Sequence, residues 1–385
     1  MRPPRPHLRI SVLCGASYVS GLEIMALAVI EGLKERGHVV HVVVNGWNDG
    51  DFPARLNALS VPHTPAFLGK ISLSPRPKYL RWTADALRRL PSGRAVVRRH
   101  VRTFQPDVVL SFNVSTLALI GDLVRSVPVV SHVHEVPGRG LTSTLLLPLA
   151  RRPIRTCVAV SEYTAGELER LGFADVRVVL NGLDIPDHPL GARAIRDVEG
   201  GGLRVGIVGQ VGAWKGHEDF VEALSLLGRR GVEVEGHVFG RGDDAFVREV
   251  RERAERAGVA VTWHGFVSDQ NEIYPHLNVL VAPSRAVETF GLVAAEAGLH
   301  GLPAVVTRRG GLPEVVVDGE TGLVVEAESP TELADALERL ARDPDLRHRL
   351  GRAGRERAMR AFSKERMVAG VEDVLRSVAP GGGTL

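Results

Sequence analysis

The chain of 385 residues has little of what builds disulfide, metal or aromatic-rich sites. It contains two cysteines, Cys14 and Cys157, and 5% aromatic residues. Both cysteines lie in apolar, strand-like runs, so we expect buried thiols rather than a disulfide. The run His132-Val133-His134-Glu135 resembles a metal site, but no further Cys/His cluster supports it. We therefore expect no metal.

Long hydrophobic runs are also missing. Stretches such as Val108–Leu110 and Val279–Ala282 are far below the roughly 20 residues of a membrane span. The first six residues are rich in Arg and Pro and lead into a strand-like run, without the apolar core or cleavage site of a signal peptide. These absences predict a cytoplasmic protein.

Two further absences narrow the function. No Gly-x-Gly-x-x-Gly follows an early strand, which excludes a Rossmann dehydrogenase. The chain also lacks an internal repeat and a low-complexity tract. What remains is an ordinary globular composition with 44% hydrophobic and 24% charged residues. A chain of this length predicts two domains.

Charge is unevenly distributed along the chain. The net charge is +3, but residues 1–185 carry 23 Lys/Arg against 14 Asp/Glu. Ten of these basic residues lie in Lys70–Arg102, beside a single acid, Asp85. One interpretation is a solvated basic helix. Another is docking on anionic lipid or on an acidic acceptor. Nucleic-acid binding is not favoured, because no binding motif accompanies the charge.

Apolar strand-like runs alternate with longer amphipathic stretches in both halves. This alternation is typical of parallel sheets with crossover helices, and it predicts two doubly wound α/β domains. Between the halves, residues 186–202 hold two prolines and three closing glycines, which predicts a linker. We expect one domain over 1–185 and a second over 203–365. Residues 366–385 should form a last helix and a frayed tail.

The segment 279–301 carries the strongest site pattern. A strand ends at Ala282, a loop carries Glu288, and Phe290-Gly291-Leu292 opens a helix that contains Glu296. Ligands of open α/β sheets bind outside the carboxyl ends of the strands. The N–H groups of a helix start attract phosphate oxygens, and a glycine there permits close approach.

Glu288 and Glu296 suit two different hydroxyl-bearing groups. With phosphates at the helix start, Glu288 can reach a sugar on one side and Glu296 a ribose diol on the other. Carboxylates accept from both O–H groups of a diol. Taken alone, two surface glutamates beside a helix start would explain the pattern equally well.

The wider pattern resembles the retaining glycosyltransferases of family 4, which have the GT-B fold. Their signature is similar to Glu288, seven residues, then Glu296, with Phe290-Gly291 between them. Other motifs follow in the family's order: Val160-Ser161, Asn181-Gly182-Leu183-Asp184, Gly310-Gly311-Leu312-Pro313-Glu314, Asp318-Gly319-Glu320-Thr321-Gly322 and Ala361-Phe362-Ser363. The resemblance implies an N-terminal acceptor domain over 1–185, a C-terminal donor domain over 203–365, and an active site in the cleft between them. It also implies that the last helix, within 366–385, crosses back to the first domain.

Further donor contacts follow from the resemblance. The loop from Gly209 to Gly216 would bring Lys215 to the diphosphate as a point charge. The family has a basic residue where Gln210 stands, so Gln210 offers an amide hydrogen bond without charge. The loop after His264 would read the nucleobase through its backbone, with Phe266 or Val267 in apolar contact. UDP is the favoured carrier, and GDP is next.

The first half contributes two more positions. Gly21 opens the first helix at a place where the family has two glycines, and here Leu22 replaces the second. Its helix start can still face an anion. His134 matches a family histidine near the reacting sugar, and we prefer it to His132. On a continuing strand these two histidines would share one face.

We therefore expect a hexosyltransferase of bacterial polysaccharide biosynthesis. It would transfer a sugar from a UDP-sugar to a hydroxyl of a glycan, lipid-linked or secondary-metabolite acceptor, without a cofactor. Two alternatives stay open at this point. One is a non-catalytic nucleotide-sugar-binding scaffold for a partner transferase, and the other is a sugar-nucleotide epimerase or hydrolase on the same fold.

Overall fold

A computed structural model of the chain describes residues 6–15, 19, 21–68, 77–138, 140–185 and 202–380. The chain divides into two compact units. Unit 1 comprises Met1–Gly182 with Lys364–Leu385, and unit 2 comprises Leu183–Ser363. The division falls near the expected boundaries at 185 and 365. Lys70 and Arg76 of the basic segment, the expected linker up to residue 201 and the expected tail 381–385 lie outside the described residues.

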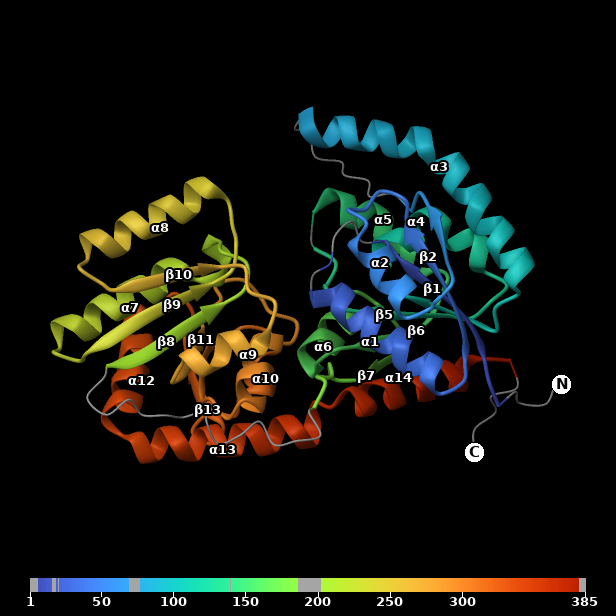
Figure 1. Cartoon of the computed structure of the whole chain (residues 1–385). Helices are drawn as coiled ribbons and strands as arrows, with labels where there is room; N and C mark the ends of the chain where they lie inside the picture. Colours follow the sequence, from blue (N-terminus) through green and yellow to red (C-terminus); the bar gives the residue numbers. More distant parts are fainter. Residues whose placement is uncertain are drawn as a thin grey trace. The chain divides into compact units, whose positions relative to one another are not determined.

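Unit 1 contains a parallel sheet in the order β3-β2-β1-β4-β5-β6-β7 (Figure 1). Its strands are β1 (Arg9–Cys14), β2 (Val39–Asn45), β3 (His63–Ala66), β4 (Val108–Ser111), β5 (Val129–Val133), β6 (Ile154–Ala159) and β7 (Val176–Val178). The central strands are mostly apolar and rich in valine, and their few polar residues, such as Ser11, Ser131 and His132, are buried, as expected for strands covered on both faces. Cys14 and Cys157 are buried in β1 and β6 and form no disulfide.

Helices connect and cover these strands. They are α1 (Gly21–Glu35), α2 (Asp51–Ala58), α3 (Pro77–Phe104), α4 (Val114–Ile120), η1 (Gly121–Val124), α5 (Leu141–Arg151) and α6 (Glu162–Arg170). The start of α1 at Gly21 agrees with the sequence prediction. The basic segment forms most of α3, where Ala86 and Val97 are buried while Leu87 is 54% exposed. The apolar positions of α3 therefore divide between the core and the surface.

The last helix, α14 (Lys364–Val378), belongs to unit 1. It packs along α1, where a Cβ on Gly32 would lie 2.5 Å from a methyl group of Val368. At the same interface, Lys364 Nζ lies 2.5 Å from Glu31 Oε2. A side chain larger than hydrogen at residue 32 would force the two helices apart.

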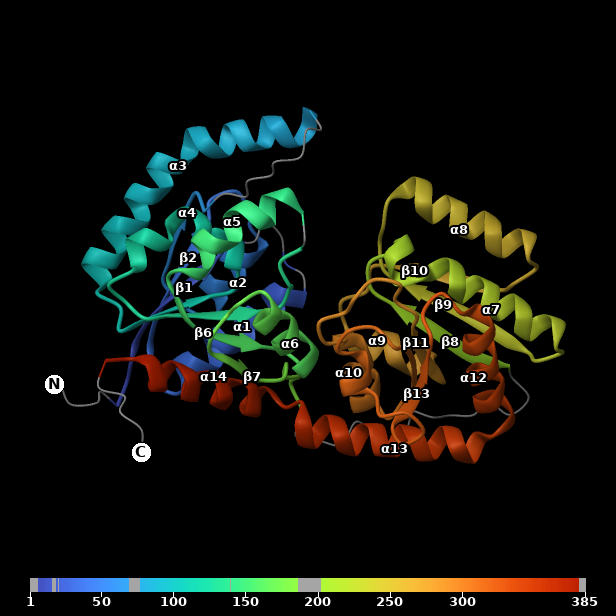
Figure 2. The same ribbon diagram turned by 180° about the vertical axis from the view of Figure 1, so that it is seen from behind.

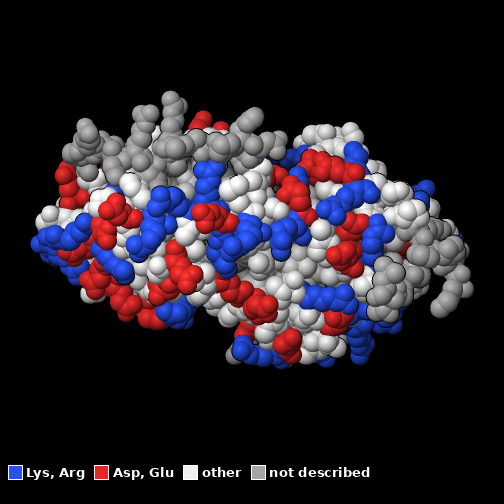
Figure 3. All heavy atoms as spheres, turned by 90° about the horizontal axis from the view of Figure 1, so that it is seen from below, with Lys and Arg blue, Asp and Glu red and all other residues white. Residues whose placement is uncertain are grey.

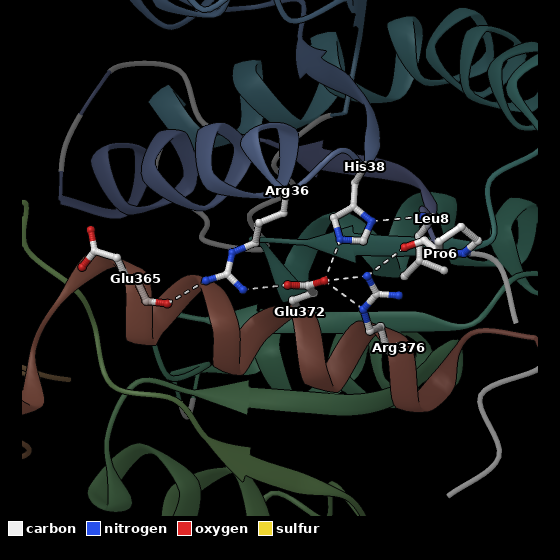
Figure 4. A network of polar contacts seen from close by, with 7 residues as sticks. All are labelled: Pro6, Leu8, Arg36, His38, Glu365, Glu372 and Arg376. Carbon is white, nitrogen blue, oxygen red and sulfur yellow. Dashed lines mark hydrogen bonds and ion pairs between the residues drawn. The ribbon is translucent and has the colours of Figure 1, made fainter. Parts of the chain in front are cut away.

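A polar network fixes the other end of this packing (Figure 4). The Glu372 carboxylate accepts from Arg36 at 2.8 Å, from His38 Nε2 at 3.0 Å and from Arg376 at 2.7 Å. His38 Nδ1 in turn accepts from the Leu8 backbone N–H at 3.0 Å, so the neutral ring carries its proton on Nε2. Burial opposes ionisation of Glu372, but the three donors hold its pKa at about 2.

Unit 2 contains a second parallel sheet, in the order β10-β9-β8-β11-β12-β13. Its strands are β8 (Leu203–Val208), β9 (Val234–Phe239), β10 (Val261–Gly265), β11 (Val279–Ala282), β12 (Ala304–Thr307) and β13 (Gly322–Val325). The sequence predicts each of these strands, because each is rich in apolar or β-branched residues and is bounded by glycine, proline or a polar loop.

The helices of unit 2 surround this sheet (Figure 2). They are η3 (Ala213–Lys215), α7 (His217–Arg229), α8 (Asp244–Arg256), α9 (Gln270–Ile273), η4 (Tyr274–His276), α10 (Leu292–Leu299), α11 (Leu312–Val315), α12 (Pro330–Arg342) and α13 (Pro344–Ala361). The main core lies between the sheet, α7 and α12, with Phe220, Leu224 and Leu337 fully buried. Each such side chain contributes roughly 1.5–3 kcal/mol.

Charged groups of both signs cover the surface drawn in Figure 3. On this face, Lys and Arg side chains are interspersed with Asp and Glu side chains, so no extended field of one sign forms there. Within the described ranges, no helix has the length and apolar character needed to cross a bilayer.

Candidate functional site

The topology of unit 2 singles out one edge of its sheet. The strand order reverses between β8 and β11, which are hydrogen-bonded neighbours. Ligands of open α/β sheets bind beside the carboxyl ends of strands at such a reversal. The loop after β8 carries Gln210 and Lys215, and the loop after β11 carries Glu288. The fold therefore brings both sequence-predicted loops to one place.

Lys215 and Glu288 form the centre of this edge. Lys215 Nζ lies 2.5 Å from Glu288 Oε1, and the Ser284 hydroxyl donates to the same oxygen at 2.7 Å. The side chains of Lys215 and Glu288 are 28% and 22% exposed. A cation and a carboxylate are thus held together while both remain accessible to a ligand. Such a pair can contact a phosphate through the ammonium group and hydroxyl groups through the carboxylate.

Arg285 joins the two loops. Its backbone N–H and that of Ala286 both donate to the Trp214 carbonyl oxygen, at 2.9 and 3.0 Å. The guanidinium group donates two bonds to Asp219, at 2.6 and 2.7 Å, and one to Glu218 at 2.7 Å. These hydrogen bonds, chiefly those with Asp219, raise the pKa of Arg285. A bidentate pair of this kind fixes orientation as well as distance.

Two glycines allow the backbone to pass close to this site. At Gly216, with φ of 75°, an added Cβ would lie 2.0 Å from the Pro283 carbonyl oxygen. At Gly310, with φ of 61°, it would lie 2.0 Å from the Glu288 carbonyl oxygen. Both the left-handed conformation and the contact require glycine. The Gly311 N–H also donates to that Glu288 oxygen at 2.7 Å.

The helix start beside Glu288 is built on Gly291. This residue has φ of 107° and is the N-cap of α10. The N–H groups of Ala294 and Ala295 donate to the Gly291 carbonyl oxygen. Phe290 is buried and its ring meets Phe362 edge to face, with centroids 5.3 Å apart. Phe290 can therefore face a ligand only through its backbone, which is also how the sequence analysis assigns Phe290, Gly291 and Leu292.

Glu296 has a separate environment. It projects from α10, and its Oε2 accepts a hydrogen bond from the Tyr274 hydroxyl at 2.6 Å. Burial raises the pKa of Glu296 to about 7, although the Tyr274 bond acts in the opposite direction. The two sequence-predicted glutamates thus differ. Glu288 is paired with a cation, whereas Glu296 is paired with a neutral hydroxyl group.

The expected diphosphate contact Gln210 and the expected base contacts Phe266 and Val267 lie in neighbouring loops of unit 2. Gln210 is exposed and follows Gly209, whose φ is 131°. Phe266 is 62% exposed, and the Arg241 guanidinium lies 5.5 Å from the centre of its ring. Val267 is half-buried. The exposed ring and the guanidinium offer a flat surface of the kind on which a nucleobase can stack.

The remaining predicted residues, Gly21 and His134, lie in unit 1. His134 follows the last residue of β5, and its ring centre lies 4.3 Å from that of His132, so the two rings share one side. Burial lowers the pKa of His134 to about 3, which makes its ring neutral near pH 7. Gly21 is exposed at the first position of α1.

Several groups at the unit 2 site could not be predicted from the sequence. Ser284, Arg285, Asp219 and Tyr274 have no motif spacing of their own, and their roles depend on partners 4 to 67 residues away. For Ser284 and Arg285, the signal in the sequence is that they lie in the same loop as Glu288. Within the described residues, no group of three or more His, Cys, Asp or Glu side chains is arranged to hold a metal ion.

Comparison with known families shows to which family the chain belongs. A family model described as "Glycosyl transferases group 1" matches residues 193–357, and a model described as "Glycosyltransferase Family 4" matches residues 19–186. The chain is a group 1 glycosyltransferase of the GT-B type. The first model covers Lys215, Glu288 and Glu296, and the second covers Gly21 and His134.

Similar proteins place this group 1 glycosyltransferase among sugar-transferring relatives. It is 32% identical over 210 residues to the D-inositol 3-phosphate glycosyltransferase of Paenarthrobacter aurescens (strain TC1), covering 53% of this chain and 51% of the relative. It is 27% identical over 298 residues to the glycogen synthase of Mycobacterium tuberculosis (strain ATCC 25618 / H37Rv), covering 71% of each. The chain thus spans about half the length of the first of these curated relatives.

Solved structures share the fold over nearly the whole chain. The structure of Anabaena Alr3699/HepE in complex with UDP-glucose matches with a TM-score of 0.79 and 20% identity, over 96% of this chain and all of that one. WaaG, a glycosyltransferase involved in lipopolysaccharide biosynthesis, matches with a TM-score of 0.68 and 17% identity, over 94% of this chain and 99% of the other. At these identities the likeness establishes the fold.

Proposed function

We propose that the chain transfers a sugar from a nucleoside-diphosphate sugar to a hydroxyl group of an acceptor. The observation that carries this proposal is the Lys215–Glu288 pair at the sheet reversal, beside the start of α10. A cation suits the diphosphate, and a carboxylate suits the hydroxyl groups of the sugar. UDP is the favoured carrier, which the UDP-glucose bound to Anabaena Alr3699/HepE supports.

Each group of the unit 2 site then has a chemical role. Lys215 and the N–H groups of Phe290, Gly291 and Leu292 bind the diphosphate, with Gln210 adding an uncharged hydrogen bond. Glu288 binds the hydroxyl groups of the donor sugar, and Glu296 binds the ribose. Phe266 and Val267 contact the base. His134 and Gly21, in unit 1, are assigned to the donor by the family resemblance.

Catalysis in this proposal depends on stabilising the leaving diphosphate. As the bond between the sugar anomeric carbon and the phosphate oxygen breaks, negative charge grows on the diphosphate. Lys215 and the N–H groups at the start of α10 would oppose that charge. A preorganised donor of this kind is worth about 3–4 kcal/mol. This charge stabilisation would replace the metal ion that other transferases use.

We propose that the reaction proceeds with retention. The acceptor oxygen would form its bond to the anomeric carbon on the face from which the diphosphate departs. The acceptor proton would pass to a departing phosphate oxygen, so no protein base is consumed. A neutral His134 can donate or accept a hydrogen bond to the sugar without adding charge.

A lipid-linked or otherwise anionic acceptor is favoured by one further feature of unit 1. On α3, Arg88, Arg98 and Arg99 are exposed together with Leu87. A basic helix with an exposed apolar residue suits contact with an anionic lipid surface. We propose this surface as the route by which the acceptor is met.

Binding of the donor gives the direct test. A calorimetric screen of UDP-, GDP- and TDP-sugars should identify a preferred base, since a ligand that binds the native state raises its melting temperature. Product formation with retained anomeric configuration, unaffected by EDTA, would support transfer without a metal. Binding of a nucleotide sugar without turnover on any acceptor would favour a non-catalytic scaffold. Absence of binding to all of them would contradict the proposal.

A further inference from the structure

Tyr274 is buried in unit 2 and is held from two sides. Its side chain is 1% exposed, and its ring stacks on His300 with centroids 4.6 Å apart. Its hydroxyl group donates to Glu296 Oε2 at 2.6 Å and lies 3.4 Å from the Val293 carbonyl oxygen. Tyr274 belongs to η4, directly before β11, whereas Glu296, Val293 and His300 belong to α10 or its C-cap. The hydroxyl group therefore joins two elements.

Glu296 presents its carboxylate asymmetrically. Oε2 is bound to Tyr274, while the residue as a whole is only half-buried. A carboxylate with one oxygen fixed has the other oxygen available as an acceptor in a defined direction. An ionised carboxylate accepts from a ribose diol far better than a protonated one, because a protonated carboxyl group carries a proton on one oxygen.

The surroundings of Glu296 work against ionisation. Burial raises the pKa of Glu296 to about 7. The hydrogen bond from Tyr274 acts in the opposite direction, because it favours the ionised carboxylate. Burial and the nearby Glu296 charge also raise the pKa of Tyr274, which keeps its hydroxyl group protonated as the donor. The bond consequently has one direction, from the phenol to the carboxylate.

The other titratable groups near Tyr274 and Glu296 do not change the direction of this hydrogen bond. His300 stacks on Tyr274 and has its pKa lowered to about 4 by burial and by Arg355 of α13, so it is neutral above pH 5. Asp269, at the N-cap of α9, acts on His300 in the opposite direction. On α13, Arg357 turns to the carbonyl oxygens of Glu314 and Val315. The strands packed against α10 are β11 and β12, which contribute apolar residues and Thr307.

We propose that Tyr274 is a positioning residue that keeps the Glu296 carboxylate ionised and aimed at the donor ribose, so that protonation of Glu296 controls donor affinity. This inference rests on the proposed function, which assigns Glu296 to the ribose. It extends that function to a residue outside the glutamate signature, and it makes donor binding sensitive to pH in the range around neutrality.

The sign of the effect follows from the chemistry. Donor affinity should be full above the pKa of Glu296 and should fall about tenfold for each pH unit below it. Removing the Tyr274 hydroxyl group removes the hydrogen bond that favours ionisation. In Tyr274→Phe the midpoint should therefore move to higher pH, with weaker binding at pH 7 and near-complete recovery at high pH.

The test is calorimetric titration of UDP-glucose between pH 5.5 and 8.5, a range in which its diphosphate does not titrate. If the donor screen selects guanine, GDP-glucose serves instead. Wild type, Tyr274→Phe, Glu296→Gln and Tyr163→Phe are compared. Tyr163, on α6 of unit 1, controls for loss of a tyrosine hydroxyl group elsewhere. We expect a raised midpoint in Tyr274→Phe, weak pH-independent binding in Glu296→Gln, and the wild-type profile in Tyr163→Phe.

A merely structural role for Tyr274 would give a different result. Tyr274→Phe would then weaken binding equally at every pH, which would overturn the inference, as would a flat wild-type profile. If Tyr274→Phe fails to fold, a measurement on the wild-type protein still tests whether donor binding requires ionised Glu296. Titration at pH 6.5 in two buffers of different ionisation enthalpy should show proton release on binding that Glu296→Gln abolishes. Failure of wild type to bind any nucleotide sugar would instead contradict the proposed function.

Discussion

Lys215 Nζ and Glu288 Oε1 lie 2.5 Å apart, although 73 residues separate them in the chain. Each comes from the loop that follows one of two neighbouring strands, β8 and β11, at the reversal of the sheet. The pair is therefore a product of topology, and neither loop alone could hold the other's side chain in place. Ser284 holds Glu288 within its own loop, and Arg285 joins that loop to Trp214 and Asp219.

Loss of either member of this pair should reduce transfer strongly. We expect Lys215→Ala to lower kcat/KM by about 10²- to 10³-fold, because charge on the leaving diphosphate loses its cation. Glu288→Ala should have a similar effect through the sugar hydroxyl groups. Steady-state kinetics with the preferred donor would measure both. Lys34→Ala, an exposed lysine of α1 bonded to the Leu59 carbonyl oxygen, is the control. Wild-type-like turnover in both variants would contradict the assignment of Lys215 and Glu288 to the donor site.

Arg285 should affect catalysis through position rather than contact. In Arg285→Ala, Asp219 loses a bidentate partner and Glu218 loses a hydrogen bond, so the Glu288 loop loses its side-chain link to the start of α7, while the backbone bonds to Trp214 remain. Hydrogen bonds to charged groups contribute about 1.5–3 kcal/mol, so a lower melting temperature is expected together with lower kcat. Arg285→Lys should restore charge but not the bidentate geometry, and hence recover stability more than activity.

The matched control for Arg285 is Arg253→Ala. Arg253 approaches the same acid, Glu218, but only at 3.5 Å and from an exposed position. Its loss should change neither the melting temperature nor kcat appreciably. Equal effects of the two substitutions would show that the charge near Glu218 matters and the link between the Glu288 loop and α7 does not.

Glu372 should make the stability of unit 1 dependent on pH. Its pKa lies at about 2 in the folded chain, below the usual value of a glutamate. A lowered folded-state pKa gives stability that is complete above about pH 4.5 and is lost as pH falls toward 2. Glu372→Gln should therefore lower the melting temperature at pH 7 and flatten its change between pH 5 and 3. Thermal unfolding followed by circular dichroism measures both.

Glu365→Gln is the control for this effect, because Glu365 contacts Arg36 through its backbone oxygen. It should leave both the melting temperature and its pH dependence unchanged. A steep loss of stability between pH 5 and 3 that persists in Glu372→Gln would place the titrating group elsewhere.

The basic surface of α3 should bind anionic lipid in a salt-sensitive way. Each Lys or Arg near such a surface contributes about 1 kcal/mol. Arg88→Glu combined with Arg98→Glu should reduce co-sedimentation with vesicles of 30% phosphatidylglycerol in phosphatidylcholine by at least about tenfold. Arg248→Glu with Arg256→Glu, on exposed positions of α8, should not. Equal binding by all variants, or none by wild type, would contradict the proposed surface.

Sequence alone predicts most of unit 2, and the reason is physical. Strand β11 is buried along its whole length and appears as an uninterrupted apolar run, and β8 is apolar except for Arg204. Glu288 and Glu296 flank a helix start whose residues are themselves diagnostic. The GT-B fold expected from the resemblance to known transferases is confirmed.

Unit 1 was harder to predict between its central strands. The strand β3 (His63–Ala66) holds a histidine, a threonine and a proline, so its composition does not indicate a strand. Helix α3 carries Pro91 and helix α5 carries Pro148 in their interiors. Local propensity disfavours helix at these places. Their structure depends on packing against the sheet, which short sequence windows do not contain.

The site residues show the same contrast between features that the sequence predicts and features that depend on tertiary contacts. Spacing predicts Glu288 and Glu296, and the family resemblance adds Lys215, but neither could predict Tyr274, which meets Glu296 across 22 residues through a single hydroxyl group. Nor could it predict that Phe290 turns inward onto Phe362. Long-range contacts of single atoms leave no periodic trace in a sequence.

The assignment of α14 to unit 1 has a consequence for biosynthesis. The ribosome makes the first 182 residues of unit 1, then all of unit 2, and only then the helix that covers Gly32 and completes the Glu372 network. Until then, the α1 surface that Val368 covers stays open to water, to chaperones and to neighbouring nascent chains. Unit 2, encoded without interruption, can fold first. Completion of unit 1 thus waits for its last helix, although its synthesis begins before that of unit 2.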